Sequence, residues 1–124
     1  MVMTKSEINL SKFKGQKSSI FTGRPQGEAA RAELHLDIID KDDDLFVVFI
    51  IPEGTTSFNP SFYLGLLYKS LKSLGIEGFK NKYTFDIRVS DSVTKNGIIR
   101  NLEDGMRNAI NSMNNRTGLS PFLS

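Results

Sequence analysis

The sequence contains no cysteine and no tryptophan, and it has a single histidine, His35. Without cysteine, the chain has no disulfides, no thiolate metal site and no cysteine nucleophile. One histidine cannot make a multi-histidine metal site, and His35 has no serine or second histidine at the spacing of a catalytic motif. We therefore expect His35 to be structural or exposed, and we predict no metal, no cofactor and no catalytic residue.

Long hydrophobic runs are also absent. No stretch approaches the roughly 20 apolar residues of a membrane helix, and residues 1–7 lack the apolar segment of a signal peptide. We expect no association with a membrane and a cytoplasmic location.

The chain has little excess charge of either sign, with a net charge of +2. Such a mild excess argues against nucleic-acid binding. The densest cluster is acidic and consists of Asp37, Asp40, Asp42, Asp43 and Asp44. It lacks the glycine and the terminal glutamate of an EF-hand loop, so we interpret it as a solvated turn rather than a Ca²⁺ or Mg²⁺ site.

A length of 124 residues with 39% hydrophobic and 24% charged residues predicts one folded domain, residues 1–124. Its N-terminal half has a weak first strand, Ile8–Phe13, which extends as an edge hairpin or bent strand toward Ser19–Phe21. Thr22–Glu28 predicts a helix entry, because proline is accepted in the first turn of a helix. We expect this helix to end near Leu34–Leu36, where the chain enters the acidic turn.

The C-terminal half begins with the strongest strand, Leu45–Pro52, a continuous apolar run that is typical of a strand buried on both faces. Asn59 is a helix cap before Pro60, and the helix runs to Leu74, where Gly75 ends it. After a polar connection at 78–83, residues 84–89 alternate as a strand covered on one face.

A last helix follows Ser92, carries apolar residues at helical spacing, and ends near Asn114. On this helix Arg100 with Asp104, and Glu103 with Arg107, are available as i, i+4 pairs. The tail, 117–124, is a separate segment that is either frayed or docked in a partner groove. The fold class is therefore α/β, with one mixed sheet of about four strands, three to four helices and at least one parallel β-α-β unit.

Two places stand out as candidate sites. The turn Gly23–Gly27 precedes a helix and could present backbone N–H groups to an anion, with Arg24 or Arg31 contacting a phosphate or a partner carboxylate. It is neither a P-loop nor a complete dinucleotide fingerprint, so a turn with a solvated Arg24 is the alternative.

Ser57 and Ser61 form the second place, at the end of a buried strand and the start of a helix, where α/β sheets commonly bind ligands. Their hydroxyls are either helix caps or phosphorylation sites. Serine catalysis is disfavoured, because the sequence is not Gly-x-Ser-x-Gly and one histidine is the only available base. The residues of this predicted interaction or phosphorylation surface are Ser57, Phe58, Asn59, Ser61 and Tyr63.

Three segments resemble the STAS-like domains of bacterial and phage genomes, which are relatives of anti-sigma-factor antagonists. These segments are Phe21–Arg31, the strand Val47–Ile51, and Thr56–Phe62 leading into a long helix. The resemblance implies a small α/β domain for protein interaction and switching, not an enzyme, often alongside a GHKL-type ATPase or kinase. It places the phosphorylatable serine of that family at Ser61 or Ser57, although the family's Asp-x-Ser motif is replaced here by Ser57-Phe-Asn-Pro-Ser61.

We therefore expect a non-enzymatic regulatory module of STAS-like type. Its partner would be another protein, such as a GHKL-type ATPase or kinase or a defence protein, and self-association stays open. The alternatives are a phage- or plasmid-borne inhibitor protein, and a small phosphate- or nucleotide-binding protein that uses the Gly23–Gly27 turn.

Overall fold

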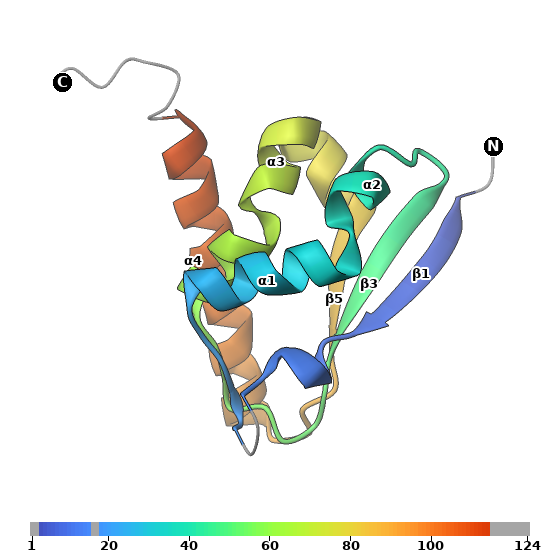
Figure 1. Ribbon diagram of the computed structural model, residues 1–124. Helices are drawn as coiled ribbons and strands as arrows, with labels where there is room; N and C mark the ends of the chain where they lie inside the picture. Colours follow the sequence, from blue (N-terminus) through green and yellow to red (C-terminus); the bar gives the residue numbers. More distant parts are fainter. Residues whose placement is uncertain (1–2, 16–17, 115–124) are drawn as a thin grey trace, which may run out of the picture.

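The computed structural model describes residues 3–15 and 18–114, and it confirms an α/β fold. The predicted tail, 117–124, lies outside the described residues. Along the chain the elements are β1 (Thr4–Asn9), a 3₁₀ turn η1 (Ser11–Phe13), β2 (Ile20–Phe21), α1 (Arg24–Leu34), α2 (Leu36–Asp40), β3 (Leu45–Ile51), β4 (Ser57–Phe58), α3 (Pro60–Lys82), β5 (Tyr83–Ile87) and α4 (Ser92–Asn114). In Figure 1, α4 lies on the opposite side of the molecule from β1.

The strands form two small sheets, both of them parallel, rather than the single mixed sheet that we predicted. The larger has the order β1-β3-β5, and the smaller pairs β2 with β4. Helices connect β1 to β3 and β3 to β5, as parallel pairing requires. Among residues 3–15 and 18–114, β1 pairs with the distant β3 and not in a hairpin with the segment that follows it.

β1 has the same length as the predicted strand at 8–13, six residues, but it begins and ends four residues earlier. It ends at Asn9, whose side-chain oxygen accepts a hydrogen bond of 2.8 Å from the backbone N–H of Ser11. This local bond turns the chain into η1, a common effect of asparagine side chains.

The two faces of β3 have different surroundings. Val47, Phe49 and Ile51 are fully buried in the core. On the other face Phe46 and Val48 are only half-buried, because their nearest neighbours are polar side chains of the flanking strands. On this outer face the prediction of burial holds only for Ile50, which is buried, and is wrong for Phe46 and Val48.

α1 and α3 cross at a pair of glycines, Gly27 and Gly65 (Figure 1). A Cβ atom added to Gly65 would lie 2.8 Å from the backbone nitrogen of Glu28, and one added to Gly27 would lie 2.8 Å from that of Leu66. Only glycine permits so close an approach of two backbones. The crossing brings the starts of the two helices together.

α3 is longer than predicted. Gly75 interrupts the helix with a φ of 75° and a ψ of 169°, but the helix resumes and continues to Lys82. The segment 78–83, predicted as a polar connection, is mostly helical and buries Phe79. The first helical segment of α3 therefore ends at Gly75, as the sequence predicts, and a second segment follows it directly across a kink.

The last two elements lie close to their predicted positions. β5 begins and ends slightly earlier than 84–89, and α4 reaches Asn114. An ion pair on α4 joins Arg107 to Asp104 at 2.7 Å, and this contact is i, i+3 and not i, i+4 as predicted. Within 3–15 and 18–114, no helix is both long and apolar enough to cross a membrane.

Candidate functional site

The hydroxyl of Ser61 joins the starts of α1 and α3. It accepts a hydrogen bond of 3.2 Å from the backbone N–H of Gly23 and donates one of 2.7 Å to the side-chain oxygen of Asn59. The same oxygen of Asn59 accepts the backbone N–H of Ser61 at 2.8 Å, which caps α3 as the sequence predicted. One half-buried hydroxyl therefore holds two helix N-termini together.

The local sequence explains why both helices begin here. Each has a proline in its first turn, Pro25 in α1 and Pro60 in α3, where a missing N–H leaves no broken bond. The N-terminus of a helix carries unpaired N–H groups and a partial positive charge. Because two such ends meet at Ser61, negative charge is favoured at this point.

Ser57, unlike Ser61, is hydrogen-bonded to the last helix, α4. Its hydroxyl donates a hydrogen bond of 3.3 Å to the side-chain oxygen of Asn101 on α4, and the backbone N–H of Phe58 donates to the same oxygen at 3.0 Å. Nothing in the sequence marks Asn101, because it lies more than 40 residues from β4 and belongs to no local motif. The two predicted serines thus connect β4 and α3 to two different helices.

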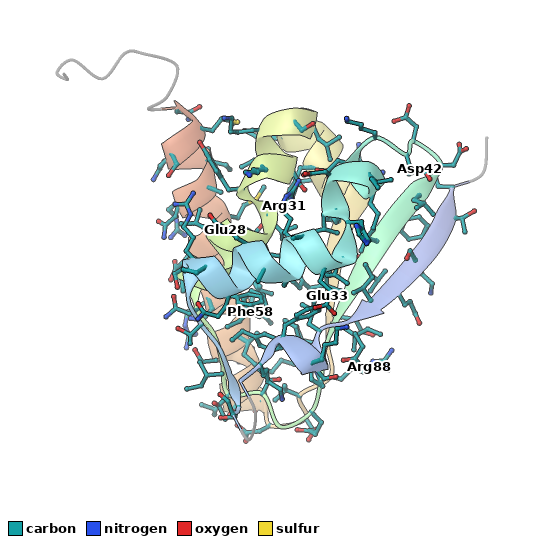
Figure 2. The ribbon with its side chains drawn as sticks, in the orientation of Figure 1. Glu28, Arg31, Glu33, Asp42, Phe58 and Arg88 are labelled. Carbon is teal, nitrogen blue, oxygen red and sulfur yellow. The ribbon has the colours of Figure 1, made fainter. Side chains whose placement is uncertain are left out.

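Two members of the predicted surface are not on the surface. Phe58 is fully buried and Tyr63 is 3% exposed. Phe58 belongs to an aromatic cluster, with ring centroids 5.1 Å from Phe21 and 5.3 Å from Phe62 (Figure 2). Tyr63 packs against Gly105 of α4, and its burial raises the pKa of the phenol. Ser57, Asn59 and Ser61 remain half-buried and reachable.

Arg24 and Arg31 have opposite environments. Arg24 is exposed at the start of α1. Its Nε lies 3.6 Å from a carboxylate oxygen of Glu28, and its guanidinium carbon lies 5.7 Å from the ring centre of Tyr68. Arg31 is only 6% exposed (Figure 2). The prediction that Arg31 contacts an external anion is therefore wrong, and Arg24 keeps that role as a candidate.

The guanidinium of Arg31 belongs to a buried polar network. It donates to Asp40 at 2.8 Å, to Asp37 at 2.6 Å and to the hydroxyl of Ser70 at 2.7 Å. Asp40 also accepts hydrogen bonds from Ser70 and from the hydroxyl of Tyr83. The network joins α1, α2, α3 and β5 inside the protein.

The network corrects the interpretation of the acidic cluster as a solvated turn for Asp40 alone, because Asp42, Asp43 and Asp44 are exposed in the turn before β3, as predicted. Asp40 is 5% exposed, whereas the side chain of Asp37 is 78% exposed. The hydrogen bond and charge of Arg31 lower the pKa of Asp37. Burial, and then the hydrogen bond to Asp40, raise the pKa of Tyr83.

The Gly23–Gly27 turn is built as a helix start. The N–H of Gly27 donates to the carbonyl of Gly23 at 3.1 Å, and Gly27 is buried against α3. The side chain of Gln26 folds over Gly23, on the side where a Cβ would stand. Because these contacts fill the turn, it offers no open cradle for a phosphate.

His35 is exposed, as expected, and joins α1 to α2. Its φ of 56° and ψ of 45° place it in the left-handed helical region. The residue therefore forms a helix-ending turn.

No family model matches the chain, and neither a curated protein nor a solved structure is similar to it. The resemblance to STAS-like domains stays a prediction.

Proposed function

We propose that the protein is a non-enzymatic regulatory module of STAS-like type, which binds another protein through one face of the molecule. This junction face consists of Arg24, Ser57, Asn59 and Ser61. The observation that supports it is the half-buried hydroxyl of Ser61 at the meeting point of two helix N-termini.

Phosphorylation of Ser61 would change this face strongly. A phosphoryl group carries about −1.5 to −2 charges at neutral pH. It would end the donation from Ser61 to Asn59, and its oxygens would face the N–H of Gly23 and the partial positive charge at the start of α3, where the N–H groups of the first turn are already bonded to Asn59. Added charge and bulk on a recognition face alter binding while the fold persists.

The class of partner rests on the resemblance. We propose a GHKL-type ATPase or kinase, with a defence protein as the second candidate, in the cytoplasm of a bacterium or in a phage-infected cell. Exposed Arg24 would provide a cation for a carboxylate or phosphate of that partner.

Affinity capture from the native host tests the proposal. Tagged wild type, Ser61→Ala and Ser61→Glu are compared with Ser11→Glu, which places the same charge on the exposed turn η1. We expect one partner to be retained by wild type, Ser61→Ala and Ser11→Glu, and to be reduced at least about tenfold by Ser61→Glu, a difference of about 1.4 kcal/mol. Capture of the same proteins in the same amounts by all four variants, each folded by circular dichroism, would contradict the proposal.

A further inference from the structure

An apolar groove of about 470 Å³ separates α4 from β5 and the end of α3. Its charged rim consists of Lys80, Glu103 and Arg107. Seven apolar or aromatic residues line it: Tyr63, Phe79, Tyr83, Phe85, Leu102, Met106 and Ile110. An apolar hollow with a charged rim is typical of an interaction surface.

α4 has a half-buried apolar row beside its buried side. Ile98, Gly105 and Ala109 are buried. About a quarter-turn around the helix lies the row, here called the α4 stripe: Ile99, Leu102, Met106, Ile110 and Met113. Its last four members pack in part against the core, and all five stay partly exposed. The middle of the stripe forms one wall of the groove, so the stripe and the groove make one continuous surface.

The spacing of the stripe is symmetric about Met106. Leu102 and Ile110 lie four residues before and after it, and Ile99 and Met113 lie seven residues before and after it. Consider a second copy whose α4 lies antiparallel to the first and is related to it by a two-fold axis at Met106. Each residue of one α4 stripe would then face an apolar residue of the stripe on the other copy. A two-fold contact requires such self-complementarity.

The flanking charges obey the same symmetry. Glu103 and Arg107 are exposed, lie one turn apart and stand on the same edge of the stripe. In the antiparallel arrangement, Glu103 of one copy lies about 3 Å along the axis from Arg107 of the other, at 1.5 Å per residue. The contact is reciprocal, so one Glu–Arg pair forms on each side of the two-fold axis, and the two Arg107 side chains, also about 3 Å apart along the axis, stand between these pairs. Arg107 now contacts Asp104 at the surface, where exchange of ion-pair partners costs little.

We propose that the occupant of this surface is a second copy of the chain, which pairs its α4 stripe antiparallel across the groove to form a two-fold dimer. This contact is separate from the junction face and goes beyond the proposed function. The dimer would cover the half-exposed stripe and close the mouth of the groove.

The absence of cysteine makes a direct test possible. A cysteine in place of Met106 stands on the two-fold axis and meets its own copy. Asn108→Cys is the matched control, because Asn108 is exposed on the opposite side of the same helical turn. Under mild oxidation, we expect Met106→Cys to form a disulfide-linked dimer at least about tenfold faster than Asn108→Cys. Equal rates in the two folded variants would overturn the proposal.

Charge reversal at the rim tests the register and leaves the apolar residues of the groove unchanged. We expect wild type to approach twice its 13.9 kDa in sedimentation equilibrium as concentration rises. Glu103→Arg and Arg107→Glu each place like charges opposite one another and should each weaken the dimer about tenfold. An equimolar mixture of the two restores both pairs and should regain the wild-type mass. The proposal would be overturned if the wild type stayed monomeric, or if the mixture had the same mass as its separate components. It would also be overturned if the chain were monomeric and a helix of another protein occupied the groove.

Discussion

Arg31 and Asp40 show how a single residue pair holds several elements of this protein together. Both side chains are almost completely buried, 2.8 Å apart, and Asp40 receives further hydrogen bonds from Ser70 and Tyr83. Removal of one member of a buried pair leaves an unpaired charge in a dry environment.

We therefore expect Arg31→Met to lower the free energy of unfolding by about 3–5 kcal/mol. Arg24→Met is the matched control on the same helix, because Arg24 is exposed, and we expect it to cost less than about 1 kcal/mol. Urea unfolding followed by circular dichroism measures both values. If both variants lowered the free energy of unfolding by similar amounts, the buried network would not be the source of this stability.

The sequence predicted local features of the site but not this network. Asn59 and Pro60 were identifiable as cap and first turn, because capping depends on neighbouring residues. Asp40 was taken for a solvated residue, because its partners come from three other elements and Tyr83 is 43 positions away. Only the tertiary fold brings these groups together.

At the scale of elements, the crossing of α1 and α3 depends on Gly65. We expect Gly65→Ala to destabilise the protein by about 1–3 kcal/mol or more, because the new Cβ collides with backbone atoms of α1. Gly97→Ala on α4 is the control: nothing lies within 4 Å of its Cβ position, so alanine should stabilise the helix by about 0.5–1 kcal/mol. Thermal unfolding of both variants checks the signs, and a destabilising Gly97→Ala or a neutral Gly65→Ala would contradict the account.

The start of α4 should be sensitive to pH. Asp91 accepts hydrogen bonds from the hydroxyl and the backbone N–H of Thr94 at 2.7 and 2.8 Å, and these bonds lower the pKa of Asp91. Because the folded pKa is the lower one, the stabilisation is present above the ordinary aspartate pKa of about 4 and is lost as pH falls through the folded pKa.

We expect Asp91→Ala to be less stable than wild type at neutral pH, and the difference to shrink on acidification below about pH 4. Asp43→Ala, which removes an exposed carboxylate from the turn before β3, serves as the control. Urea unfolding at several pH values gives the comparison. A difference that grows as pH falls would rule out this cap.

The same scale explains why the segment 78–83 is helical and not the predicted polar connection. Gly75 has the signature of a helix end, and its φ is positive as such an end requires. The helix nevertheless resumes, because the next turn buries Phe79 against Tyr83, with ring centroids 5.5 Å apart. The burial of Phe79 therefore stabilises a second helical segment directly after the helix end at Gly75.

At the scale of the whole molecule, the class of fold could be predicted and the strand pairing could not. Apolar runs and alternation located β3 and β5 closely, but they placed β1 four residues too late and did not predict β4. The pairing of β1 with β3 across two intervening helices was not predicted either. The partial exposure of Phe46 and Val48 on β3 and the groove beside α4 could not be predicted either, because the sequence does not show which elements pack against them.

The central claim of this account is that Ser61 is the residue at which an interaction module is switched. Mass spectrometry of the protein isolated from its native host, with phosphatases inhibited and all serine-containing peptides covered, tests it most directly. The account predicts a phosphoryl group on Ser61, where two helix N-termini favour negative charge, in at least one growth condition. Ser61 unmodified in every condition, with phosphate on another serine such as Ser57 or Ser11, would contradict it.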